Sequence, residues 1–424
     1  MPTTPTLNSI QRAMVDQEGR LVFPGEFSQR YGLNPGTEIC IDEETNGLYL
    51  RRPVESLAKI YVEPTNLCNL NCRTCIRNSW EEPLGRMSDA TFARIIEGVQ
   101  AISYPLTIFF GGLGEPLFHP AIVEMVAQAK DARCRVELIT NGTLLSPQMS
   151  KDLIAAGLDM LWVSLDGATP ESYSDIRLGA QLPQVLQNIE AFRAARRAAD
   201  HQVEIGIVYV AMKRNIGDLP AILRLRTRLG ASQIFVSNVL PYTEDMCREV
   251  QYSRALSEVY STPSSWSPHI DLPRIDTNET TRQALHAIWH GGYRLSFNGD
   301  PIDRGMNRCP FITRGSVAIA WDGSLSPCPP LMHDHDSYLD NISNKQPRHS
   351  RRYMIGNLSE HNLEELWIQP AYLDFRRRVQ EFDFSPCSIC GGCDLVEANE
   401  EDCFGNTFPT CGGCLWAQGV IQCP

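Results

Sequence analysis

Three cysteines within eight residues, Cys68, Cys72 and Cys75, constrain this chain of 424 residues more than any other feature. Their C-x3-C-x2-C spacing lets all three sulfurs face one point of a loop, just after an extended apolar run over residues 59–65. Three thiolates on a four-iron cluster leave one iron open to a small molecule. A structural zinc site would need a fourth Cys or His close by, and the next candidate is His119. A disulfide would leave an odd thiol and require an oxidising compartment, so the spacing favours an iron–sulfur site.

The cysteine segment and the apolar run before it together resemble the signature of the radical S-adenosylmethionine (SAM) superfamily. The resemblance implies that Cys68, Cys72 and Cys75 hold a 4Fe–4S cluster whose open iron binds the amino and carboxylate groups of SAM. It also implies that an electron from the cluster breaks the sulfonium and releases a 5′-deoxyadenosyl radical.

A length of 424 residues suits two or three domains. The composition is that of a soluble globular protein, since 43% of the residues are apolar and 21% are charged. No apolar run reaches membrane-spanning length, and the first residues lack the order of a secretory signal, so we expect a cytoplasmic protein without membrane contact. Fifteen cysteines in such a chain indicate metal sites rather than disulfides. A formal net charge of −12 argues against nucleic acid as the main partner.

Residues 1–55 are expected to form a small β-rich domain. Asn46-Gly47 is a hairpin signal between apolar runs at 39–41 and 48–50, and one or two helical turns are predicted at 26–31. The pattern resembles the AbrB-like swapped-hairpin domain, in which two copies interlock. Five Arg and no Lys face eight Asp and Glu in this segment, a net of −3, so docking or dimerisation through residues 1–55 is favoured over DNA binding.

Residues 56–241 alternate strand-like and helix-like segments. The strand-like runs are 59–65, 106–112, 135–142, 160–167, 203–210 and 232–241. Ser88 is the expected cap of the first helix, whose apolar residues recur with the helical period. Alternation of this kind predicts an α/β fold with a parallel sheet, but periodicity does not distinguish an open sheet from a barrel. The family resemblance implies a partial (β/α)6 TIM-like barrel with the cluster at the carboxyl ends of the strands.

Polar and glycine residues follow several of these strands, where a parallel β/α fold places its active site. The loop after the second strand contains Gly112, Gly114 and Glu115, whose backbone and carboxylate could approach SAM. The usual family form is G-G-E-P, whereas here Gly112-Leu113-Gly114 precedes Glu115-Pro116. Four further residues at strand ends and one residue beyond them complete the predicted SAM contacts: Thr140, Asn141, Ser164, Asp166 and Arg177. Turn chemistry for the first four and a solvated surface arginine for the last remain alternatives.

Residues 242–305 are predicted to form a bridging segment with one short helical pattern at 284–289. Residues 306–424 form a cysteine-rich domain that resembles the SPASM extension of radical SAM maturases, which holds two further 4Fe–4S clusters. The predicted auxiliary ligands are Cys309, Cys328, Cys387, Cys390, Cys393, Cys403, Cys411, Cys414 and Cys423. Two clusters need eight ligands, so one cysteine is left over. A zinc ribbon remains the alternative, since Cys387-x2-Cys390 and Cys411-x2-Cys414 are 20 residues apart.

Five other Cys and His residues have simpler interpretations. Cys40, Cys134 and Cys247 are interpreted as small buried apolar residues. His333 and His335 could be ligands or acid–base groups, but loop residues are the favoured interpretation.

Several long segments resemble one subgroup closely, the radical SAM maturases associated with tungsten-cofactor enzymes of the aldehyde ferredoxin oxidoreductase type. These segments are residues 61–68, 73–80, 110–116, 162–170 and 317–323. The resemblance implies a maturase that acts on such an enzyme or its cofactor, with reduced ferredoxin or flavodoxin as electron donor. Two alternatives remain open. One is a peptide-modifying SPASM maturase that forms thioether or carbon–carbon crosslinks, and the other is a non-enzymatic metal-sensing regulator.

Overall fold

The computed structural model describes most of the chain, with gaps. The described residues are 13–25, 28, 38–44, 47–102, 104–199, 202–252, 269–272, 294–297, 300–301, 309–338, 348–382, 384, 401–402 and 405–424. For 42–44, 47–49, 269–272, 294–297, 300–301 and 348 only the backbone is described. Within these ranges, no helix has the length and apolar character needed to cross a membrane.

A sheet of nine strands in the order β10-β9-β8-β7-β6-β5-β14-β15-β18 forms the centre of the molecule. Six of its strands come from the predicted barrel and pair in parallel: β5 (Lys59–Val62), β6 (Thr107–Phe110), β7 (Arg135–Thr140), β8 (Met160–Ser164), β9 (Glu204–Ala211) and β10 (Gln233–Asn238). Because all six point the same way, their carboxyl ends meet at one edge, where the predicted SAM residues lie. The predicted α/β class and partial barrel are confirmed.

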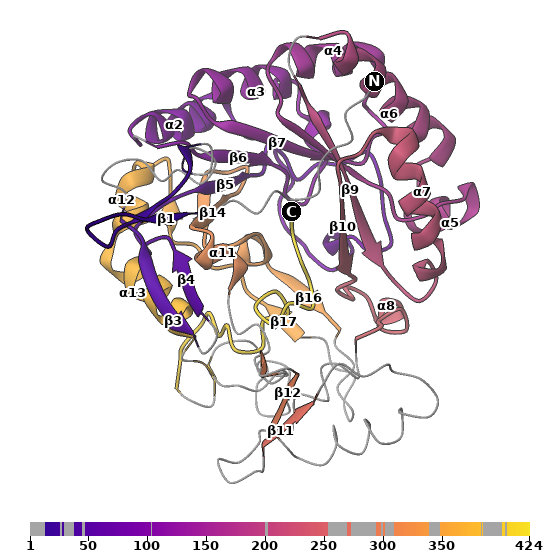
Figure 1. Ribbon diagram of the computed structural model, residues 1–424. Helices are drawn as coiled ribbons and strands as arrows, with labels where there is room; N and C mark the ends of the chain where they lie inside the picture. Colours follow the sequence, from indigo (N-terminus) through magenta and orange to yellow (C-terminus); the bar gives the residue numbers. More distant parts are fainter. Residues whose placement is uncertain are drawn as a thin grey trace.

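Helices connect successive strands and cover the outer face of the curved sheet (Figure 1). They are α2 (Asp89–Gln100), α3 (Ile122–Asp131), α4 (Pro147–Ala155), α5 (Pro170–Ile176), α6 (Leu182–Arg197) and α7 (Leu219–Leu229), followed by α8 (Glu244–Cys247). Short 3-10 turns η1 (Ile76–Asn78), η2 (Pro116–Phe118) and η3 (Ile216–Asp218) lie between them. The Ser88 hydroxyl accepts from the Thr91 backbone N–H at 3.1 Å, which confirms the predicted cap of α2. Phe92, Ile95 and Val99 of that helix are buried against the sheet, each contributing about 1.5–3 kcal/mol.

The carboxyl-terminal part of the chain extends the same sheet. Strand β14 (Ser316–Ile319) pairs in parallel with β5, and β15 (Ser324–Ser326) and β18 (Gly356–Asn357) follow in antiparallel order. Gly323 has φ +85° in the predicted hairpin turn between β14 and β15, a conformation that favours glycine. The remaining elements are α11 (Pro310–Thr313), η4 (Pro329–Leu331), β16 (His335–Ser337), β17 (Arg348–Ser350), α12 (Leu363–Ile368) and α13 (Pro370–Glu381). Residues 309–338 therefore lie directly beside the first strand of the barrel.

Two antiparallel pairs lie before the barrel: β1 (Met14–Val15) with β2 (Leu21–Val22), and β3 (Cys40–Glu44) with β4 (Gly47–Arg51). The second pair is the predicted hairpin. Met14 and Val15 expose 70% and 69% of their surface. Three short strands of the predicted bridging segment, β11 (His269–Leu272), β12 (Arg294–Phe297) and β13 (Asp300–Pro301), form a separate sheet. The predicted helical turns at 26–31 lie almost entirely outside the described residues, and the pattern at 284–289 does so completely.

Candidate functional site

Cys68, Cys72 and Cys75 lie on the loop after β5 and line one cavity of about 280 Å³. The loops that follow β6, β7 and β8 form its other walls. The lining also includes Thr74, Ile76, Gly112, Leu113, Gly114, Glu115, Ile139, Thr140, Asn141, Ser164, Arg177 and Tyr242. Seven of the eight residues predicted to contact SAM therefore lie around the same space as the three thiols.

The environment of the three sulfurs combines burial with hydrogen-bond donors. Burial raises the pKa of the Cys75 thiol to about 11 and also raises the pKa of Cys68. The Cys68 sulfur accepts from the Leu70 backbone N–H at 3.4 Å, and the Arg177 guanidinium lies 4.0 Å from the Cys72 sulfur. Since burial disfavours a bare thiolate at Cys68 and Cys75, a positively charged ligand would favour ionisation of these two sulfurs, which suits a metal cluster.

Glu115 is fixed by three donors. Its Oε1 accepts from the Thr140 hydroxyl at 2.7 Å and from the Leu117 N–H at 3.1 Å, and its Oε2 accepts from the Asn141 N–H at 2.8 Å. Burial raises the pKa of this carboxyl, and the three donors oppose that rise. A carboxylate has about four acceptor sites, so Glu115 keeps capacity for one further donor on the cavity side.

Arg177 forms a buried bidentate pair with Asp166. Its Nε and one terminal nitrogen lie 2.7 and 2.6 Å from Asp166 Oδ2. Asp166 Oδ1 accepts from the Val210 N–H at 2.8 Å, so the carboxylate is anchored to β9. Asp166 does not line the cavity; it holds Arg177 there. The surface alternative for Arg177 is wrong, because only 14% of its side chain is exposed.

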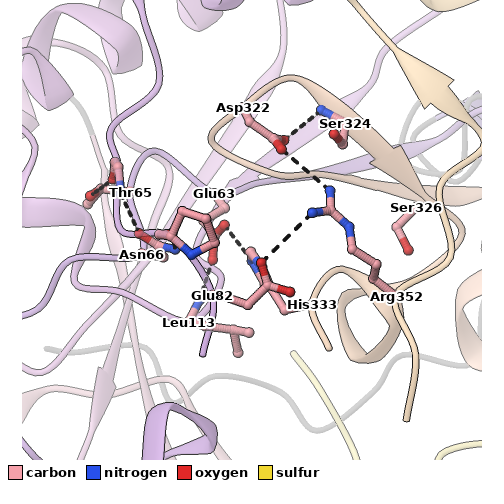
Figure 2. A network of polar contacts seen from close by, with 12 residues as sticks. Glu63, Thr65, Asn66, Glu82, Leu113, Asp322, Ser324, Ser326, His333 and Arg352 are labelled. Carbon is pink, nitrogen blue, oxygen red and sulfur yellow. Dashed lines mark hydrogen bonds and ion pairs between the residues drawn. The ribbon is translucent and has the colours of Figure 1, made fainter. Parts of the chain in front are cut away.

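Sequence reasoning missed a buried network beside the cavity. Glu63, directly after β5, is fully buried, and its Oε1 accepts from the Leu113 N–H at 3.0 Å. Its Oε2 lies 2.9 Å from His333 Nε2, and Figure 2 shows these groups meeting between the barrel and the carboxyl-terminal domain. The available signal was a lone acidic residue ending an otherwise apolar strand. His333 and His335 are both buried. His333 lies in the loop between η4 and β16, as predicted, whereas His335 begins β16, so the loop interpretation is wrong for His335.

A second cavity, of about 80 Å³, is lined by four cysteines, Cys309, Cys328, Cys411 and Cys414. Burial raises the pKa of Cys309 to about 12 and that of Cys328 and Cys411 well above its usual value, and the neighbouring sulfurs add to the rise. No three His, Cys, Asp or Glu side chains within the described ranges meet closely enough to hold a single metal ion. Four cysteines around one cavity match the ligand set that a 4Fe–4S cluster takes.

Tyr242 and His335 lie between the two cavities. Tyr242 lines the first cavity, His335 lines the second, and their rings are 5.6 Å apart in an edge-to-face arrangement. Such contacts are typical of well-packed aromatic pairs. This ring pair therefore joins the wall of one cysteine-lined cavity to the wall of the other.

The remaining cysteines differ in setting. Cys423 does not line the second cavity; its sulfur accepts from the Trp416 indole N–H at 3.4 Å. Cys134 is buried, as predicted. Cys40 and Cys247 are only partly buried, and the Cys247 thiol donates to the Tyr338 carbonyl at 3.2 Å, so the interpretation as small buried apolar residues is wrong for both. Cys387, Cys390, Cys393 and Cys403 lie outside the described residues.

Comparison with known proteins agrees with this geometry. Residues 62–225 match the Radical SAM superfamily, and residues 309–394 match SPASM, an iron-sulfur cluster-binding domain. The chain belongs to the radical SAM superfamily and is an enzyme of that class. It is 29% identical, over 86% of its own length and 96% of the other protein, to the tungsten-containing aldehyde ferredoxin oxidoreductase cofactor-modifying protein of Pyrococcus furiosus.

Two further similarities bear on family and fold. The chain is 30% identical to the probable GTP 3',8-cyclase of Methanococcus maripaludis, over 70% of this chain and 92% of that protein. The solved structure of tagged anSMEcpe with bound AdoMet aligns with a TM-score of 0.52 at 15% identity, covering 86% of this chain and 93% of that one. At that identity the structural similarity shows the fold alone.

Proposed function

We propose that this enzyme binds a 4Fe–4S cluster and SAM in the cavity at the barrel mouth and uses them to start radical chemistry on its substrate. The observation that carries the proposal is the convergence of Cys68, Cys72 and Cys75 with Glu115 and Arg177 around one space. When bound, the cluster and SAM together supply reductive cleavage of the sulfonium and a 5′-deoxyadenosyl radical.

The residues of the chain have separate tasks in this proposal. Cys68, Cys72 and Cys75 hold the cluster and leave one iron open. Glu115 accepts a hydrogen bond from the ammonium group of SAM at its free acceptor site. Arg177 binds the SAM carboxylate. Because Gly112 and Gly114 have no side chains, the loop backbone can lie close to the bound SAM. Thr140, Asn141 and Ser164 line the wall where polar groups of SAM need partners.

The second cavity supplies the ligands of one auxiliary cluster, Cys309, Cys328, Cys411 and Cys414. By counting, Cys387, Cys390, Cys393 and Cys403 would then ligate the second auxiliary cluster. Cys423 is our choice for the ninth cysteine that neither cluster uses, because it is not among the cysteines that line the cavity and its sulfur already accepts from the Trp416 indole. Tyr242 lines the SAM cavity and His335 lines the second cavity, and their ring contact would provide an electron path from one cavity to the other.

The substrate we propose is a tungsten-cofactor enzyme of the aldehyde ferredoxin oxidoreductase type, or its cofactor. Its support is the similarity to the Pyrococcus furiosus protein over nearly the whole length of both chains. Reduced ferredoxin or flavodoxin would donate the electron, and residues 1–55 would mediate dimerisation or docking. The alternative of a peptide-modifying maturase remains, whereas a non-enzymatic regulator conflicts with the family membership.

Co-expression tests this substrate directly. A tungsten-dependent aldehyde oxidoreductase would be produced with the wild-type chain, with Cys72→Ala, and without either, and its extracted cofactor compared by mass spectrometry. We expect a cofactor mass change only with the wild-type chain. Identical cofactors in all three preparations would exclude this substrate and leave the peptide alternative, which is tested by mass changes in short peptides encoded next to the gene.

A further inference from the structure

A carboxylate with no access to water lies next to the SAM cavity. Glu63 is fully buried, and the β5 backbone that precedes it pairs with β6 and β14. Burying an ionised carboxylate costs several kcal/mol unless it is paired and hydrogen-bonded. Glu63 therefore needs specific hydrogen-bond and charge partners at this position.

One oxygen of Glu63 holds the SAM loop. Oε1 accepts from the Leu113 N–H at 3.0 Å, and both Gly112 and Leu113 line the cavity. Gly112 has φ +97°, and a Cβ there would come within 2.7 Å of the Glu63 side chain, so loop and carboxylate are in close contact. Glu63 thus fixes the backbone that passes beneath the ligand space.

The other oxygen is paired with a histidine from the carboxyl-terminal domain. His333 Nε2 lies 2.9 Å from Glu63 Oε2, and only 2% of the histidine side chain is exposed. Among the described residues its Nδ1 has no hydrogen-bond partner, and it lies 3.7 Å from Glu82 Oε2. The Trp80 ring packs edge-to-face on the imidazole at 4.8 Å and shields it from water.

The surrounding charges favour an imidazolium at this position. Burial alone would lower the pKa of His333, but the hydrogen bond and charge of Glu63, with the charge of Glu82, outweigh it and raise that pKa. The opposing cation is Arg352, which lies 3.8 Å from Glu82 and 3.4 Å from Asp322 (Figure 2). The two carboxylates therefore favour the protonated form of His333 more than burial disfavours it.

We propose that His333 is a positioning residue for SAM: it pairs with Glu63 across the domain boundary, and Glu63 in turn fixes the Gly112–Leu113 backbone at the cavity. The inference rests on the proposed binding of SAM in this cavity. It makes the carboxyl-terminal domain, beyond any cluster it holds, a structural part of the SAM site. His333 does not line the cavity, so in this proposal it acts through Glu63 and the loop.

The test measures SAM affinity of the anaerobically reconstituted holoenzyme, using the change in the EPR spectrum of the reduced cluster on SAM addition. The variants are His333→Ala, Glu63→Gln, and the double variant Glu63→Gln with His333→Gln. The matched control is His349→Gln, a half-exposed histidine of the same domain that pairs with Asp336. Iron content and thermal midpoint are recorded for each variant to separate folding from positioning.

We expect His333→Ala to weaken SAM binding on the order of 10- to 100-fold, since breaking a buried pair leaves an uncompensated charge. The double variant should recover most of this loss, because a neutral amide pair can keep the Leu113 contact without a buried charge. Glu63→Gln alone should lose less than His333→Ala, and His349→Gln should match wild type. The wild-type affinity should fall as pH rises through the raised pKa of His333, and this dependence should vanish in the double variant.

Three results would overturn the inference or its basis. Wild-type affinity in His333→Ala would refute the positioning role while leaving the proposed function intact. Equal loss in His333→Ala and in the double variant, with no recovery, would refute the charge argument. No SAM-induced change in fully iron-loaded wild type would refute the SAM site itself, and the inference with it.

Discussion

Gly114 provides a sharp test of the SAM loop, because its Cα faces the backbone that leads into the cluster loop. A Cβ at position 114 would lie 2.2 Å from the Thr65 carbonyl oxygen, 2.6 Å from the Leu67 carbonyl oxygen and 2.8 Å from the Asn66 carbonyl carbon. All three are backbone atoms next to Cys68, so no side chain can rotate away to relieve the contact. The Glu115 N–H also bonds the Leu67 carbonyl at 2.9 Å, which ties the two segments together. Gly114→Ala must therefore separate the SAM loop from the cluster loop.

The size of the effect follows from this overpacking. One methyl group forced into a well-packed site typically costs about 1–3 kcal/mol. If SAM binds only when the two loops are in contact, bringing them together again in the variant costs SAM affinity, by about 5- to 150-fold. If SAM binds equally well to the separated loops, the cost appears as lower stability instead. The sum of the two losses, expressed as free energy, should fall in that range.

The assay is SAM affinity, measured together with the free energy of unfolding, in Gly114→Ala and in the control Gly217→Ala. Gly217 has nothing within 4 Å of its hypothetical Cβ, so its substitution should change neither quantity adversely. Wild-type affinity and stability in Gly114→Ala would refute the packing of the two loops described above.

Three further predictions concern other parts of the molecule. Cys411→Ser should lower the iron content by about 4 irons per chain by removing one auxiliary cluster, whereas Cys423→Ser should leave the iron content unchanged. Iron analysis with Mössbauer spectra measures both, and equal losses of iron would contradict the ligand assignment. Arg376 is fully buried, and its guanidinium stacks on the Trp367 and Tyr372 rings at 3.6 and 4.2 Å. Arg376→Ala should therefore lower the free energy of unfolding by about 2–4 kcal/mol. Arg377→Ala, at the half-exposed neighbour, should lower it by less than about 0.5 kcal/mol. Denaturant unfolding measures both, and equal effects would be inconsistent with this packing. Because the pKa of His333 is raised in the folded state, the contribution of this histidine to stability should be complete below about pH 6.5 and should be lost as pH rises through the folded-state pKa. A pH series of unfolding midpoints would show this loss. A flat series over that range would contradict the ion pair.

Local sequence patterns were sufficient for the order of strands and helices, whereas the barrel itself followed from the family resemblance. Alternating strand and helix periods predicted the order of β5 to β10, and the Ser88 cap and the Gly323 turn occur where their chemistry predicts. Predicted SAM residues converge because each follows the carboxyl end of a strand in one parallel sheet. This rule needs only the strand order, which the pattern provides.

Long-range pairing explains what the sequence did not reveal. His333 meets Glu63 across 270 positions of chain, through the addition of β14 to the edge of the barrel, and no local pattern encodes that contact. The same applies to the grouping of Cys309 and Cys328 with Cys411 and Cys414, since several connectivities fit the spacing equally. Arg177 was ambiguous because a surface arginine and a buried one look alike until Asp166 is placed beside it.

Release of 5′-deoxyadenosine is the most direct test of the central claim. Anaerobically reconstituted wild type and Cys72→Ala would be reduced with dithionite in the presence of SAM, and the product quantified by chromatography. The account predicts about 12 irons per wild-type chain with 5′-deoxyadenosine release, and loss of release in Cys72→Ala with the auxiliary iron retained. Absence of 5′-deoxyadenosine from fully iron-loaded wild type, with and without candidate substrates, would contradict it.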